Sequence, residues 1–291
     1  MGTMTEATIN GLFMGSLYGL IAVGLSLVFG VMKVVNFAHG SLLTICMYAV
    51  YYLVMKANWN SYLTPILVVP LLFIFGYVVQ SKIINPVLKR EFELGGGHAV
   101  ILLTVGMMLV MENLCLLFFG AYYKVAQVPI SSLTLNIGNI VISVPRMIAG
   151  IVSVILIFLL YAFLNKTDMG KAIRATGQDR EAVRLMGIND FKIYNISFGI
   201  CFIMLTLAAA LMIPMYYVHP SAGKIFELRS FVIVVLGGLG SLNGAFLGGI
   251  IIGLIESVTA QFLSATTAEF LIFLVFILVL LLKPNGLLGK K

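Results

Sequence analysis

Long apolar runs separated by short polar connections make up most of this chain. About 20 apolar residues in a helix span a bilayer. On that scale the sequence predicts about eight membrane-spanning segments, at 8–31, 37–55, 61–81, 99–119, 147–164, 194–218, 231–258 and 269–282. These runs do not alternate between apolar and polar residues as the strands of a membrane barrel do. The predicted fold class is therefore all-α, a polytopic transmembrane helical bundle, and residues 1–291 are expected to form a single transmembrane domain.

Two of these apolar regions contain polar interruptions, one bounded by glycines near 29–40 and one rich in glycine near 237–244. Glycine is unfavourable inside a helix, and broken helices at membrane depth occur where they are buried in protein or line a wet cavity. We therefore predict broken or re-entrant segments at both places, and one interruption in each half of the chain is typical of transporters. The residues expected to border a path or gate are Asn36, His39, Gly40, Gly237, Gly238, Gly240, Asn243 and Gly244. The alternative for Asn36 and His39 is that they bond the backbone groups that the break leaves free.

Charge patterning sets the orientation. With the N-terminus outside, most of the 18 lysines and arginines face the cytoplasm, as the positive-inside rule requires. Lys82, Lys89 and Arg90 are expected in a cytoplasmic turn over 82–90. A single crossing by 231–258 would place the basic C-terminus outside, so this segment is predicted to go in and come back out. The basic residues expected on the outer side are Lys56, Lys124, Arg146, Lys224 and Arg229.

Composition narrows the class further. The chain is 61% hydrophobic and only 10% charged, far below the charge of a soluble domain, so we expect a multi-pass protein of the cell membrane. Its three cysteines lie in apolar runs and do not form a disulfide framework. The net charge of +7 does not indicate nucleic-acid binding, because the basic residues lie between apolar runs. No spacing of histidine, cysteine or acidic residues predicts a metal site.

The cytoplasmic loop at about 165–192 is amphipathic. Residues 179–186 predict a short helix that begins at Asp179 and ends before Gly187. An apolar patch with a charged rim favours a docking element over a solvated connector. The residues assigned to this element are Gly170, Arg174, Ala175, Asp179, Ala182, Leu185, Met186 and Gly187.

Several stretches resemble a known family. Residues 11–40, with Asn-Phe-Ala-His-Gly at 36–40, the loop 170–189, the glycine block 237–249 and the tail 283–289 are similar to LivH-type permeases of branched-chain amino acid ABC importers. The resemblance covers essentially the whole chain. It departs at Asn243, where proline is more common, and at Asn285. It implies a second homologous permease, two cytoplasmic ATP-binding subunits and an extracytoplasmic substrate-binding protein as partners.

The residues agree with a permease that does not itself use ATP. A phosphate-binding loop needs the pattern G-x-x-x-x-G-K-[S/T], and no Gly-Lys pair of this chain fits it. We therefore expect no bound cofactor, ATP on a partner subunit, and no enzymatic activity. The main hypothesis is the translocation path for leucine, isoleucine and valine. The alternatives are a permease of the same family for urea or short amides, and a proton-coupled amino acid carrier that uses Glu112 or Glu256.

Overall fold

A computed structural model of the chain describes residues 2–57, 60–94, 98–126, 128–137 and 140–289. This part of the chain is almost entirely helical, which confirms the predicted fold class. Within it, seven helices are long and apolar enough to cross a membrane. The elements are α1 (Gly2–Met32), α2 (His39–Ala57), α3 (Pro65–Val79), a π-helix (Gln80–Ile84), α4 (Asn85–Leu94), α5 (Ala99–Phe119), a 3-10 helix (Pro129–Ser132), β1 (Thr134–Ile137), β2 (Ile140–Ser143), α6 (Val144–Lys166), α7 (Asp168–Gln178), α8 (Arg180–Leu185), α9 (Asp190–Met212), α10 (Gly223–Gly237), α11 (Leu242–Phe262) and α12 (Ala265–Leu282).

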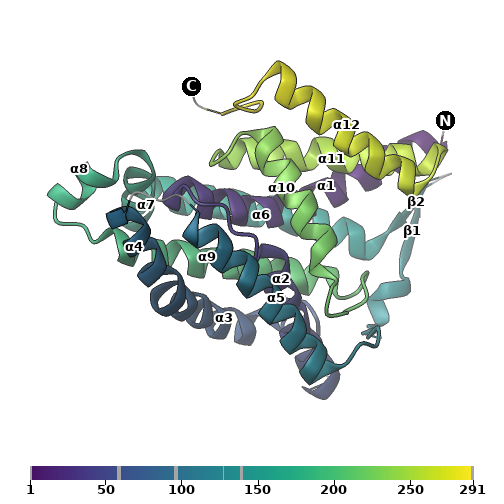
Figure 1. The fold of residues 1–291 in the computed structure, drawn as a ribbon. Coiled ribbons are helices and arrows are strands. Elements are labelled where there is room, and N and C mark those ends of the chain that lie inside the picture. The colour runs from purple at the N-terminus through teal and green to yellow at the C-terminus, as the bar shows by residue number, and fades with distance from the viewer. Residues whose placement is uncertain (1, 58–59, 95–97, 127, 138–139, 290–291) are drawn as a thin grey trace.

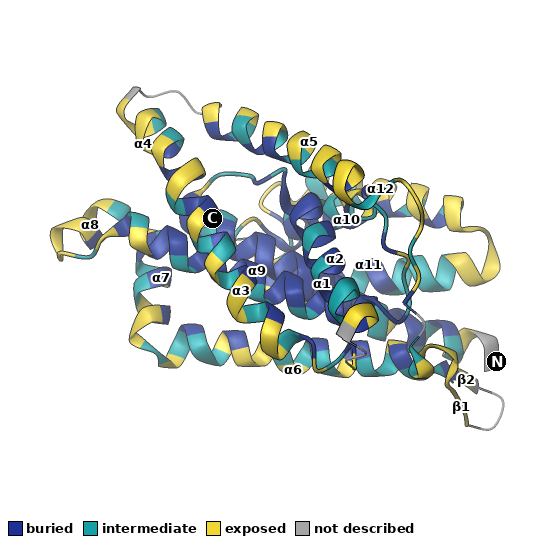
Figure 2. Ribbon diagram, turned by 90° about the horizontal axis from the view of Figure 1, so that it is seen from below, coloured by how far each residue is buried: buried dark blue, intermediate teal, exposed yellow. Residues whose placement is uncertain are grey.

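Two helices form the centre of the bundle. α1 and α9 contact each other and are mostly buried, as is most of α2, whereas α3, α5, α6, α11 and α12 expose apolar side chains outward (Figure 2). α6, α10 and α11 pack on α1, while α2 and α3 pack on α9, and α12 lies outside α11 (Figure 1). Exposed leucines and phenylalanines on α3, α5 and α12 suit contact with lipid, because acyl chains are as apolar as these side chains.

Glycines allow α1 and α11 to approach very closely. A methyl group added at Gly15 would lie 2.7 Å from the carbonyl oxygen of Gly249, and one at Gly253 would lie 2.3 Å from the Cα of Gly15. The two helices are antiparallel, since Gly240 meets Gly30 near the inner end of α1 while Gly253 meets Gly15. Small residues at such a seam let backbones pack where no hydrophobic effect favours association.

The predicted in-and-out path of 231–258 is present, but its elements differ in length. α10 begins at Gly223 rather than at 231 and descends to Gly237. A turn at 238–241 follows, and α11 returns toward the outer end. The described part of the C-terminal tail therefore lies at the inner end, as the charge pattern requires; Lys290 and Lys291 fall outside the described residues.

Two local expectations were wrong, and one connection has structure that was not predicted. The segment 82–90 is not a turn, because α3 continues through the π-helix into α4. The helix predicted at 194–218 ends at Met212, and residues 213–222 form turns and irregular backbone. The outer connection between α5 and α6 contains an antiparallel hairpin, in which Thr134 pairs with Ser143 and Leu135 with Ile142.

Candidate functional site

The first interruption is narrower than predicted and lies inside the bundle. α1 ends at Met32, residues 33–38 are non-helical, and α2 begins at His39. His39 is 1% exposed, and its Nε2 donates to the carbonyl oxygen of Ile21, in the interior of α1. The Oδ1 of Asn36 accepts from the backbone N–H of Ala38 at 3.0 Å. Asn36 therefore bonds a backbone group at the break, whereas His39 bonds a carbonyl in the middle of α1, eleven residues before that helix ends.

A second chain segment turns back into the bundle from the opposite side. After α9 ends at its outer end, residues 213–222 lead inward to Gly223, where α10 begins. Prolines at 214 and 220 are the sequence signal for this interruption, which the sequence reading missed. The backbone N–H of Gly223 donates to Thr44 Oγ1 at 3.0 Å.

The beginnings of α2 and α10 meet within the membrane-spanning region. A methyl group at Gly223 would lie 1.8 Å from the carbonyl oxygen of Gly40, so only glycine fits at this crossing. Since α1 descends before α2 rises, and α9 rises before α10 descends, the two halves have opposite directions. This is the arrangement of transporters built from inverted repeats with discontinuous helices.

Charged side chains gather beside this crossing. Lys224 on α10 forms a salt bridge of 2.6 Å with Glu112 on α5. The Oε2 of Glu227, one turn further along α10, lies against the backbone of Gly40. Lys224 was expected on the outer side of the membrane; it lies in the first turn of α10, the end that the chain enters from the outer side, and its ion pair ties it to Glu112 of α5.

A second ion pair connects α10 to the helices behind it. Arg229 lies 2.9 Å from Glu256 on α11 and 3.8 Å from Glu269 on α12, and it donates to the hydroxyl of Tyr18 at 2.8 Å. The Arg229 side chain is only 15% exposed, so it is held inside the bundle, between residues of α11 and α12 that lie within two turns of the outer ends of those helices. A charge this far from water needs such partners, because an unpaired buried charge is very costly.

The glycine-rich turn lies at the inner end of the bundle. Gly238 and Gly240 have φ of +106° and +81°, which favour glycine. Ser241 caps α11 by accepting from the N–H of Gly244 at 3.1 Å. The C-terminal tail covers the turn, since Leu287 and Leu288 donate their N–H groups to the carbonyls of residues 236 and 237. Gly237 and Gly244 lie in the flanking helices, where their backbones contact directly.

This turn and the cytoplasmic loop border the same cleft. The cleft has a volume of about 460 Å³ and lies between α1, α6, α7 and the turn. Gly240 lines it from the turn, Asn243 from the first turn of α11, and Arg174 from α7. Gly177 of α7 is packed so closely on α1 that a methyl group there would lie 2.7 Å from the Gly30 carbonyl oxygen. A displacement of α7 would therefore be transmitted directly to α1 and to the edge of the turn.

The cytoplasmic loop folds as two short helices rather than one. α7 (Asp168–Gln178) packs on α6 at Gly170, with Ala175 half-buried, and Arg174 donates to Asn165 at 2.5 Å. α8 begins after Asp179, whose Oδ1 accepts from the N–H of Ala182, and Gly187 follows with φ of +80°. The predicted short helix and both of its boundaries are confirmed.

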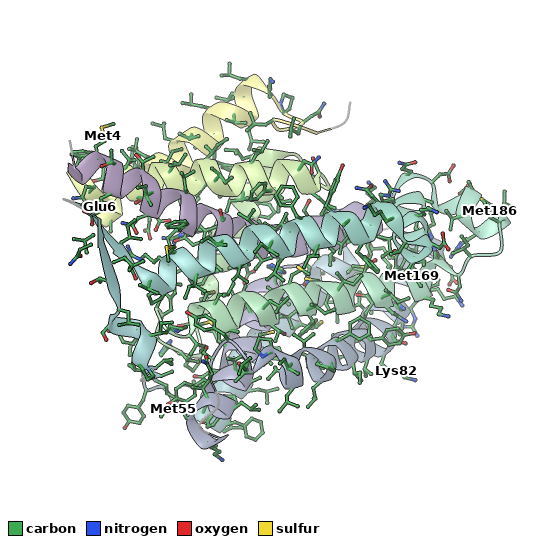
Figure 3. The ribbon with its side chains drawn as sticks, turned by 180° about the vertical axis from the view of Figure 1, so that it is seen from behind. Met4, Glu6, Met55, Lys82, Met169 and Met186 are labelled. Carbon is green, nitrogen blue, oxygen red and sulfur yellow. The ribbon has the colours of Figure 1, made fainter. Side chains whose placement is uncertain are left out.

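The tip of α8 presents the predicted apolar patch. Leu185 is 90% exposed and Met186 is 77% exposed, with Ala182 exposed beside them. Figure 3 shows Met186 at the end of the molecule opposite Met4 and Glu6. The base of α8 is held firmly, because Arg180 and Arg184 both pair with buried Asp190 and Arg180 stacks over the ring of Phe92 at 3.5 Å.

The predicted site residues therefore fall in two places. Gly40 lies at the crossing of α2 and α10 with His39 beside it, and Asn36 lies in the break before α2, whereas the glycine turn lies at the inner end, beside the cytoplasmic loop. Glu227 was missed. The apolar segment was predicted to begin at Phe231, so Glu227 fell outside it. A carboxylate only four residues before that segment is the signal that could have identified it.

Interrupted half-length helices, a bundle of apolar spans and charges held within it define a multi-pass membrane transport protein. Comparison with known proteins makes this specific. Residues 7–280 match the model for the permease component of the branched-chain amino acid transport system, and the chain belongs to this family.

Relatives cover nearly the full length. The chain is 29% identical to the high-affinity branched-chain amino acid transport system permease BraD of Pseudomonas aeruginosa, over 98% of this chain and 95% of the relative. It is 30% identical to LivH of Escherichia coli K12, over 97% and 94%. The fructose import permease FrcC of Rhizobium meliloti is 36% identical over 35% of this chain and 31% of its own. No solved structure matches this chain.

Proposed function

We propose that this chain is a permease subunit of an ABC importer and forms part of the translocation path for branched-chain amino acids. The observation that carries the proposal is the crossing of α2 and α10 inside the membrane, with charged side chains beside it. The full-length similarity to BraD and LivH supports leucine, isoleucine and valine as the substrates.

We assign energy coupling to the cytoplasmic loop. α8 offers exposed Leu185 and Met186 on a base fixed by Asp190, which suits docking of the loop helix into a groove on an ATP-binding subunit. Closure of two such subunits on ATP would move α7, and α7 contacts both α1 and the cleft beside the glycine turn. Substrate would arrive from an extracytoplasmic binding protein, and a second homologous permease would complete the path.

The proposal is tested by reconstituting the complex with its partner subunits in liposomes. ATP-driven uptake of leucine that requires the binding protein would support it. Uptake of urea or short amides instead would support the alternative substrate within the family. Uptake by this chain alone, driven by a proton gradient, would show a secondary carrier. The ion pairs of Glu112 with Lys224 and of Glu256 with Arg229 argue against that carrier, because each carboxylate is already engaged by a positive side chain.

Docking of the ATPase has its own test. Leu185→Glu places a charge on the exposed patch and should prevent copurification of the ATP-binding subunits. Leu133→Glu is the matched control, because Leu133 is also exposed but lies in the outer connection before β1. Replacing Arg174 should uncouple ATP hydrolysis from uptake while membrane insertion continues. Unchanged copurification and uptake in these variants would refute the coupling assignment.

A further inference from the structure

Three charged side chains lie together several helical turns from the inner end of the bundle. Lys224 and Glu112 are joined at 2.6 Å, and Glu227 is near enough to interact electrostatically with both. Glu112 is seven residues from the outer end of α5, about 10 Å at 1.5 Å per residue. Glu227 lies against Gly40, next to His39, which is bonded to the interior of α1.

These charges are not sealed inside the chain. The Lys224 side chain is 56% exposed and that of Glu112 is 21% exposed. α10 and α5 lie on the same side of the bundle in Figures 1 and 2. Charged side chains at this depth do not face lipid; they face a bundle interior or a water-filled cavity. The face formed by α5 and α10 is therefore a wall of the path that a second permease closes.

An aromatic pair continues the same side of α10. Residues 224, 227 and 231 follow helical spacing, so they share one face of the helix. The ring of Phe231 stacks on that of Phe37 with centroids 6.1 Å apart, and both residues are half-buried. The face thus carries one positive group and two carboxylates. An apolar aromatic surface lies beside these charges, on their cytoplasmic side.

We propose that this face is a binding site for the zwitterion of an aliphatic α-amino acid during its passage. Lys224 receives the substrate carboxylate, and Glu227, together with Glu112, receives the ammonium group. The side chain rests on Phe37 and Phe231. The site takes an amino acid with both charges and rejects an analogue that lacks one of them, because a buried charge left unpaired is costly. This inference rests on the proposed function and adds a specificity site to it.

The test measures ATP-driven leucine uptake by the full complex in liposomes. Lys224→Met and Glu227→Gln should each lower uptake roughly ten- to a hundredfold, the range expected for one lost bond to a charged group. Lys56→Met and Glu6→Gln are matched controls at the outer ends of α2 and α1, and they should transport as wild type. Assembly is checked by copurification of all subunits and by ATPase activity.

A double variant separates recognition from a structural ion pair. Lys224→Met with Glu112→Gln removes both members of the ion pair, so neither is left without its partner. If the pair only holds α5 against α10, uptake should return to the wild-type rate. If Lys224 binds the substrate carboxylate, uptake stays low in the double variant, whereas Lys224→Arg retains much of it.

The outcomes distinguish this inference from the proposed function. The zwitterion site is overturned if the wild-type complex takes up leucine and both Lys224→Met and Glu227→Gln are fully active, or if the double variant restores uptake. Either result leaves the permease function standing. Absence of amino acid uptake by the assembled wild-type complex overturns the proposed function itself.

Discussion

The seam between α1 and α11 gives a prediction whose magnitude follows from its geometry. A methyl group at Gly253 would lie 2.3 Å from the Cα of Gly15, whereas carbon atoms in contact are about 3.5–4.0 Å apart. Gly253→Ala must therefore separate two helices by more than about 1 Å. Overpacking of this kind costs about 1–3 kcal/mol. Helix propensity works in the opposite direction and favours alanine by about 1 kcal/mol.

Gly106→Ala on α5 is the matched control, because nothing lies within 4 Å of the methyl group it would add. Both substitutions gain the same propensity, so the difference between the two variants isolates the overpacking cost. At about 2–4 °C per kcal/mol, Gly253→Ala should melt roughly 2–12 °C below Gly106→Ala. The buried cysteines 46, 115 and 201 supply the assay, since a thiol-reactive dye reports their exposure on heating. Equal melting temperatures would refute close packing at this seam.

Three further predictions concern charge and backbone conformation. Arg229→Met should destabilise the fold by about 3–5 kcal/mol, because it strands Glu256 in a poorly hydrated site; adding Glu256→Gln should recover much of the loss in the same melting assay. Asp190→Asn weakens the contacts that hold the base of α8 and should raise proteolytic cleavage of the cytoplasmic loop at least severalfold, a result that equal digestion rates would contradict. Gly240→Ala, at φ of +81°, should cost about 1–2 kcal/mol, while Gly187→Asn, at φ of +80° with open space around it, should melt within about 1 °C of wild type.

The elements with strong local signals were predictable from the sequence. α8 was expected within one residue at each end, because Asp179 caps it and Gly187 adopts the left-handed conformation that ends it. The in-and-out path through the glycine turn followed from charge parity, since the chain had to bring its basic C-terminus back inside. These features depend on neighbouring residues or on a global count of crossings.

Features that depend on distant partners were not predictable in the same way. Arg229 looked like an outer-side anchor, and only the fold shows Glu256 and Tyr18 beside it. The ion pair of Lys224 was not predictable for the same reason, because its partner Glu112 lies over 100 residues earlier in the chain. Hydropathy also hid the start of α10, since Gly223 to Arg229 contains three charged residues whose membrane position is stabilised by tertiary pairing.

The close contact between α1 and α11 has a consequence for how the chain is made. α1 completes its packing only when α11 has been made, and the hydroxyl of Ser257 then bonds the carbonyl of Ala7 across 250 residues. Until then the glycine face of α1 has lipid or another protein against it. A chain truncated before α11 would insert its early spans but lack the helix that covers the glycine face of α1. This uncovered face would be a defined target for membrane quality control on every unfinished copy.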